Sequence, residues 1–131
     1  MARVRVILGF AAGVIMILSS VVHSVVGWGQ LHAELEATHA PAGLTLGLLA
    51  IWQFAGGAML ALGCIVLACF ARRGGSRSDP LAVRIIALLY VAFGLWALAI
   101  SHFDPFFLVF IVPGALLAIA AGLRGPGPNQ T

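Results

Sequence analysis

The chain has 131 residues, of which 62% are hydrophobic and 8% are charged, and its mean hydropathy is +1.11. This composition excludes an ordinary water-soluble domain, because the chain has too few polar side chains to cover such a surface. The formal net charge of +3 comes from arginines placed beside apolar segments, so it predicts membrane topology and excludes a nucleic-acid-binding face.

Four segments are long and apolar enough to cross a bilayer, which takes roughly 20 residues. They cover residues 6–27, 44–70, 83–101 and 106–123. The N-terminal segment resembles a secretory signal peptide, but its apolar run is longer than a signal core and has no convincing cleavage site, so we expect it to be the first transmembrane helix. The sequence therefore predicts an all-α integral membrane protein, a four-transmembrane-helix bundle that forms one domain over residues 1–124.

The connections between the spans differ in length and composition. We expect an outer loop over residues 28–43, with a short surface helix over 31–39 that Pro41 interrupts. Residues 71–82 are rich in Gly, Ser and Arg and predict a solvated inner loop. The last two spans are joined by a tight turn over residues 102–105, and residues 125–131 predict a disordered tail.

The arginines predict the orientation of the bundle, because positive flanks stay in the cytoplasm during insertion. All seven flank what would be the same side of the membrane, namely Arg3, Arg5, Arg72, Arg73, Arg77, Arg84 and Arg124. The other two connections contain no Lys or Arg. We therefore expect both termini to be cytoplasmic.

Small residues recur at helical spacing in three of the spans. Because lipid tails are as apolar as leucine, transmembrane helices associate where small side chains let their backbones approach. These stripes predict packing inside the bundle or against a partner protomer, although ordinary packing explains such motifs equally well. They comprise Gly9 and Gly13, Gly57 and Ala61, and Gly114, Ala118 and Gly122.

The topology places all four histidines at or near the outer face, and two of them suggest a metal site. His32, Glu36 and His39 stand at positions i, i+4 and i+7, which aligns them on one face of a helix. Imidazole and carboxylate ligands suit zinc or iron. The alternative is a polar outer loop whose side chains face water.

His23 and Gln53 lie inside spans, where a polar side chain without a partner is costly. Together with nearby aromatic and polar residues they predict a pocket open to the outer leaflet, which would hold a lipid or quinone-like molecule more readily than a metal or haem. The pocket set is His23, Trp52, Gln53, Tyr90, Trp96 and His102. The alternative is that His23 and Gln53 only tie helices together through a hydrogen bond.

Short motifs resemble those of small bacterial membrane proteins. Arg5 with Leu8-Gly9, the run Gln53 to Gly63, and the tight last turn resemble the layout of DoxX-like proteins, and His23-Ser24-Val25-Val26-Gly27 resembles an HSxxG signature of uncharacterised four-helix bacterial proteins. The resemblance implies a bacterial inner-membrane location and, loosely, quinone-coupled sulfur redox chemistry. The chain departs from it by having Gln53 where an acidic residue is common and no outward cysteine, so no activity is carried over.

The sequence leaves three functions open and does not decide whether the chain is an enzyme. The first is an accessory or self-associating bundle, in a homo-oligomer or a larger membrane complex, with an outward pocket for a lipid or quinone-like ligand. The second is a membrane redox or metal-dependent enzyme that uses the outer histidines. The third is a small transporter, although no acidic residue lies within a span.

The orientation is tested by labelling single cysteines in intact cells, in a variant that lacks Cys64 and Cys69. Because we expect residue 33 to lie outside and residue 76 inside, Ala33→Cys should react with a membrane-impermeant reagent and Ser76→Cys should not. The opposite pattern would reverse the predicted topology.

Overall fold

The computed structural model describes residues 2–71 and 80–122, and every regular element in these ranges is helical. Within them, four helical segments are long and apolar enough to cross a membrane: Arg3–Ala37, Ala42–Ala71, Leu81–Ile100 and Pro105–Gly122. The predicted fold class, an all-α protein with four membrane-spanning helices, is confirmed. The expected tail, 125–131, and most of the expected inner loop, 71–82, lie outside the described residues.

The first span is longer than the sequence analysis expects. Helix α1 (Ala2–Val22) continues through a π-helical turn, η1 (His23–Gly27), into α2 (Trp28–Ala37), and α3 (Ala42–Ala71) follows after a short turn. Most of the expected outer loop, 28–43, is therefore helix. The reason is local, because the chain contains no proline before Pro41, and residues 30–37 are mostly good helix formers.

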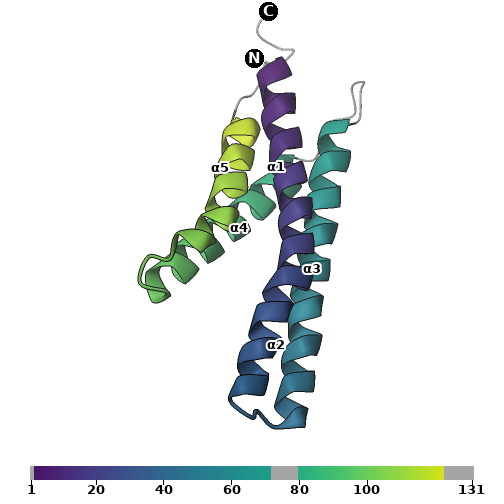
Figure 1. The fold of residues 1–131 in the computed structure, drawn as a ribbon. Helices are drawn as coiled ribbons and strands as arrows, with labels where there is room; N and C mark the ends of the chain where they lie inside the picture. Colours follow the sequence, from purple (N-terminus) through teal and green to yellow (C-terminus); the bar gives the residue numbers. More distant parts are fainter. Residues whose placement is uncertain (1, 72–79, 123–131) are drawn as a thin grey trace, which may run out of the picture.

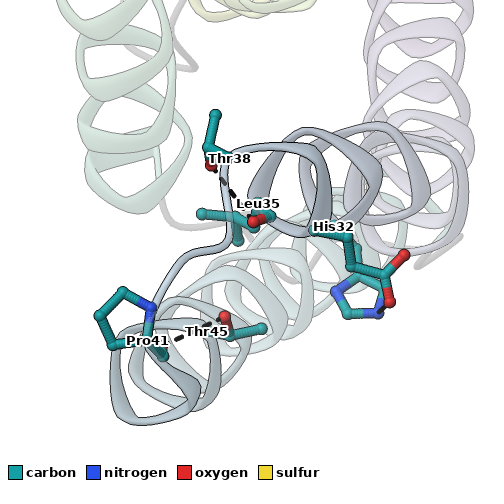
Figure 2. Close-up of polar contacts among 6 residues, drawn as sticks. His32, Leu35, Thr38, Pro41 and Thr45 are labelled. Atoms are coloured by element: carbon teal, nitrogen blue, oxygen red, sulfur yellow. Dashed lines mark hydrogen bonds and ion pairs between the residues drawn. The ribbon is translucent and has the colours of Figure 1, made fainter.

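Side-chain and backbone caps produce the turn between α2 and α3 (Figure 2). Thr38 ends α2 by donating its hydroxyl to the carbonyl oxygens of Glu34 and Leu35, at 2.9 and 3.2 Å. His39 then takes a left-handed backbone conformation with φ of 53°. Helix α3 starts where the Pro41 carbonyl oxygen accepts the backbone N–H groups of Leu44 and Thr45, at 2.9 and 3.1 Å, and it also accepts from the Thr45 hydroxyl at 3.5 Å.

The last two spans form a second, shorter hairpin. Helix α4 (Pro80–Ile100) is followed by a 3-10 turn, η2 (Pro105–Phe107), and by α5 (Leu108–Gly122). The turn between them has left-handed backbone at His102 and Phe103, and the Asp104 side chain accepts a hydrogen bond from the Phe106 N–H at 2.9 Å. These bounds agree closely with the expected spans 83–101 and 106–123.

The two hairpins meet through α1 and α5. Helix α1 packs along α3 on one side and against α5 on the other, and α4 packs against α5. The α4–α5 hairpin slants away from the α1–α3 hairpin toward its own turn (Figure 1). The hairpins are therefore closest near the two chain ends and diverge toward the turns.

The buried core lies at the end of the bundle where the hairpins meet. It draws on all four spans and includes Met16, Val66, Phe70, Tyr90 and Leu117. By contrast, α2 has no buried residue, and the buried residues of α3 begin only at Gly56. Large apolar side chains elsewhere face outward, such as Phe54 at 79% and Leu88 at 71% exposure, so these surfaces contact lipid.

The hairpins differ in reach. At about 1.5 Å per residue, the 35-residue first span is about 50 Å long and the 30-residue α3 about 45 Å, whereas the hydrocarbon core is about 30 Å thick. The 20-residue and 18-residue spans of the second hairpin match that thickness. The α1–α3 hairpin is therefore longer than the hydrocarbon is thick, so it tilts or extends beyond it, and α2 carries polar residues at its turn end.

Two glycines of α3 allow a matched test of helix packing. A Cβ at Gly63 would lie 2.8 Å from Ile17 Cγ1 and 3.2 Å from the Ile17 backbone nitrogen, whereas one at Gly57 would meet nothing within 4 Å. We expect Gly63→Leu to lower the free energy of unfolding in detergent by about 1–3 kcal/mol, because overpacking forces the helices apart. Gly57→Leu gains the same helix propensity and should not destabilise the protomer. Equal unfolding free energies for the two variants would contradict the α1–α3 contact.

Candidate functional site

The π-helical turn η1 places His23 at a widened part of the first span. In this turn the Trp28 N–H donates to the His23 carbonyl oxygen, five residues back instead of four. Such turns are rare and occur mostly as single insertions in α-helices, frequently at functional sites. A carbonyl oxygen has two lone pairs, so the carbonyl oxygens of residues 23 and 24 can also accept donors from a neighbouring helix.

Two side chains of α3 supply those donors. Trp52 Nε1 donates to the His23 carbonyl oxygen at 2.8 Å, and Gln53 Nε2 donates to the Ser24 carbonyl oxygen at 3.0 Å. A hydrogen bond also runs from His23 to α3, because the His23 Nε2 lies 3.3 Å from the Trp52 carbonyl oxygen. We call His23, Ser24, Trp52 and Gln53 the interhelical clamp.

Ring stacking holds the clamp in one geometry. The His23 and Trp52 rings stack with centroids 4.3 Å apart and planes within 6°. Gly56 makes the approach possible, since a Cβ there would overlap the Ser24 hydroxyl and lie 3.5 Å from His23 Cδ2. The His23 ring is thus fixed both by a hydrogen bond and by a flat aromatic surface.

A cleft of about 220 Å³ lies beside the clamp, where the second hairpin begins to diverge from the first. Its wall comes from α1 and η1, from α3, and from η2 and α5. The lining side chains are Ile15, Leu18, Ser19, Val22, His23, Met59, Phe106, Val109 and Phe110. Ser19 and His23 are the polar residues of this wall, and the rest is apolar.

The structure brings together only part of the predicted pocket. His23, Trp52 and Gln53 form the clamp, but of these only His23 lines the cleft. Trp96 is 59% exposed and packs against Phe93, with ring centroids 5.8 Å apart. The cleft beside His23 therefore takes its far wall from the fourth span, outside the first three spans of the expected pocket.

Tyr90 and His102 also lie away from the cleft. His102 is exposed in the turn of the second hairpin. Tyr90 is buried behind Phe110, with ring centroids 5.9 Å apart, and its hydroxyl has no hydrogen-bond partner among the described residues. Neither side chain reaches the polar side of the cleft.

The predicted pocket lacked the wall from the fourth span and did not include Ser19, which lines the cleft with His23. Ser19 precedes His23 by four residues, so helical spacing places both on one face. The phenylalanines Phe106, Phe107 and Phe110 at the head of the last span were the available signal for an aromatic wall. The packing of α1 against α5 is a tertiary contact that no local sequence pattern predicts.

The predicted metal set is only partly assembled. His32 Nε2 and Glu36 Oε1 lie 3.4 Å apart, and Trp28 stacks on the His32 ring at 5.5 Å. His39 lies beyond the end of α2, in the left-handed turn. Within residues 2–71 and 80–122, no three His, Cys, Asp or Glu side chains gather into a group that could hold a metal ion.

The predicted packing motifs divide between the interior and the surface. Gly9 and Gly13 are buried, against Phe70 and Leu67, and Gly114 is buried against Val91 and Tyr90. The exposed members are Gly57, Ala61, Ala118 and Gly122. Close packing also involves four glycines outside the predicted motifs, namely Gly27, Gly56, Gly63 and Gly94.

Comparisons with known proteins identify no family for this chain: no family model, no curated protein and no solved structure matches it. The resemblance to small four-helix membrane proteins is thus supported at the level of architecture, by the four apolar helices.

The clamp can be tested with two tryptophans of the same chain. Trp52→Phe keeps an aromatic ring against His23 but removes the N–H that donates to the His23 carbonyl oxygen at 2.8 Å. We expect a loss of about 0.5–1.5 kcal/mol in the free energy of unfolding in detergent. The matched control Trp96→Phe, at a site that is 59% exposed, should change it by less than about 0.5 kcal/mol. A Trp52→Phe variant as stable as this control would show that the bond does not hold the helices.

Proposed function

We propose that this four-span membrane protein is an accessory protein that holds a lipid-like or quinone-like molecule in the cleft beside His23. The observation that supports this most is the cleft itself, with its two polar residues set in an otherwise apolar wall. A few convergent polar groups in an apolar wall are typical of small-molecule sites. In hydrocarbon, they also orient the polar end of an amphiphile.

The size of the cleft favours a single ring. An apolar cavity of about 150 Å³ accepts benzene, so a volume of about 220 Å³ suits one substituted six-membered ring and is small for a fused ring system. Leu18 and Val22 border the cleft and are 60% and 50% exposed. An alkyl tail would leave the cleft over these side chains and run between the diverging hairpins into lipid.

The geometry favours this function over the two alternatives. A metal-dependent enzyme would draw on His32, Glu36 and His39, of which only the first two lie together. Proton-coupled transporters typically use an acidic residue within a span, and all four acidic residues, Glu34, Glu36, Asp79 and Asp104, lie outside the predicted spans. A binding role requires only the cleft and the clamp.

The cellular setting is part of the proposal. The arginine distribution supports cytoplasmic termini, which places His23 in the outer half of the bilayer, and the resemblance to small bacterial membrane proteins supports a bacterial inner membrane. Self-association is also proposed. The Gly57→Leu variant would reveal it by lowering oligomer size in detergent without lowering protomer stability, because Gly57 faces open space in the protomer.

Filling the cleft tests the proposed ligand. Val109 lines the cleft, whereas Val112, about one turn further along α5, does not and is 46% exposed. In a Trp28→Phe, Trp96→Phe background, Trp52 is the single tryptophan, and decylbenzoquinone bound near His23 should quench its fluorescence. We expect saturable quenching in this parent and in Val112→Phe, and at least about tenfold weaker binding in Val109→Phe, because the added ring occupies the site.

Partitioning of the quinone into the detergent micelle is the competing explanation. It would produce the same non-saturable quenching in the parent and in both variants, and that result would overturn the proposed site.

A further inference from the structure

The hydrogen bond of the His23 ring determines which of its nitrogens carries the proton. His23 Nε2 lies 3.3 Å from the carbonyl oxygen of Trp52, and a carbonyl oxygen can only accept. Nε2 is therefore the N–H donor. In the neutral imidazole the other nitrogen, Nδ1, then carries a lone pair and acts as an acceptor.

The clamp prevents the ring from reversing these roles. A flipped ring would lose the bond to the Trp52 carbonyl oxygen, and the stack at 4.3 Å with Trp52 restricts tilting. Trp52 Nε1 is not available as a donor to the His23 ring, because it donates to the His23 carbonyl oxygen at 2.8 Å. His23 lines the cleft, and its ring has one acceptor, Nδ1, and no free N–H.

The rest of the cleft offers this acceptor few donors. Among the lining residues, Ser19 has the only other polar side chain, and the part of the chain that the structure describes makes no hydrogen bond to Nδ1. Hydrocarbon supplies no donor either. An acceptor of this kind favours ligands that have a hydroxyl group. When a ligand without a hydroxyl group binds, the acceptor is left without a hydrogen bond, and this costs binding free energy.

We propose that the molecule held in the cleft is an aromatic alcohol, a lipid-soluble phenol or quinol, whose ring hydroxyl donates a hydrogen bond to His23 Nδ1. This inference rests on the proposed function and narrows its ligand class. A quinone or an aryl ether of the same size has only hydrogen-bond acceptors, and His23 Nδ1 is also an acceptor. Such a ligand enters the cleft without this bond and binds more weakly.

A pair of probes that differ only at the hydroxyl tests the proposal. Binding of 4-nonylphenol and 4-nonylanisole to the full chain in nanodiscs is followed by Trp52 fluorescence in the single-tryptophan background. We expect the phenol to bind about three- to tenfold more tightly, as one net hydrogen bond allows. Equal affinities would overturn this inference and leave the proposed function standing, whereas absence of saturable binding for both would overturn the proposed function as well.

Two variants assign the preference to a residue. His23→Phe retains a ring against Trp52 but has no acceptor, so the phenol should lose its advantage while the anisole still binds. Ser19→Ala tests the other polar side chain of the cleft, and Val112→Phe, outside the cleft, should leave the preference unchanged. Loss of the preference in Ser19→Ala with its retention in His23→Phe would show that Ser19, and not His23, makes the bond.

If His23→Phe does not fold, NMR of the unsubstituted protein tests the same hydrogen bond. In protein labelled with ¹⁵N-histidine, His23 is assigned by its absence from the spectrum of His23→Gln. Its nitrogens should show the Nε2–H tautomer, and nonylphenol should shift the Nδ1 resonance while nonylanisole does not. A protonated Nδ1, or equal shifts with both probes, would overturn the proposal.

Competition between the two kinds of aromatic alcohol then identifies the source of the ligand. If decylbenzoquinol displaces nonylphenol at a concentration below that of nonylphenol, the result supports a quinol as the ligand. If a concentration above that of nonylphenol is needed, the result supports a simple phenol. Failure of the quinol to compete better than decylbenzoquinone would contradict the donor requirement itself.

Discussion

In hydrocarbon, every backbone carbonyl group that leaves the regular helical pattern must find a donor within the protein, because no water is available. At η1 the π-helical turn pairs the His23 carbonyl oxygen with the Trp28 N–H, five residues further on. Trp52 and Gln53 add donors from the next helix to the carbonyl oxygens of His23 and Ser24. The first span can therefore widen at this point and still cross the membrane, and the same contacts hold the His23 ring at the border of the cleft.

The cleft results from the way the hairpins are joined. Both hairpins contribute to one core near the chain ends, and α1 is the helix that packs against α3 as well as α5. Away from that core the second hairpin slants off (Figure 1), and no side chain of α4 lines the cleft that opens between α1 and α5. Glycines such as Gly63 and Gly94 hold each helix pair at close range, so the divergence occurs between the hairpins and not within them.

Part of the candidate site could be predicted from polarity alone. An imidazole at His23 and an amide at Gln53 inside apolar spans each demand a partner, and both have one in the structure. Their partners are not each other, as simple pairing of polar side chains would suggest, but backbone carbonyl oxygens. The acceptor for Gln53, the Ser24 carbonyl oxygen, lies in the π-helical turn of residues 23–27, and nothing in the local sequence distinguishes this turn from ordinary α-helix.

The sequence by itself determined that the protein lies in lipid, that its fold is all-α, and that it has four spans. The reason is that hydrophobicity summed over about 20 residues is a property of each segment alone. It did not determine how far the first span runs: residues 28–37 are polar enough for a loop, yet nothing breaks the helix before Pro41. Only the tertiary structure decided that α5, and not α4, faces His23, that Tyr90 lies behind Phe110, and that Gly57 and Ala118 face outward. Small and apolar residues occur on every face of these helices, and lipid and protein are equally apolar surroundings for them. Which face meets a neighbour is therefore set by the fit between helices and not by the pattern within one.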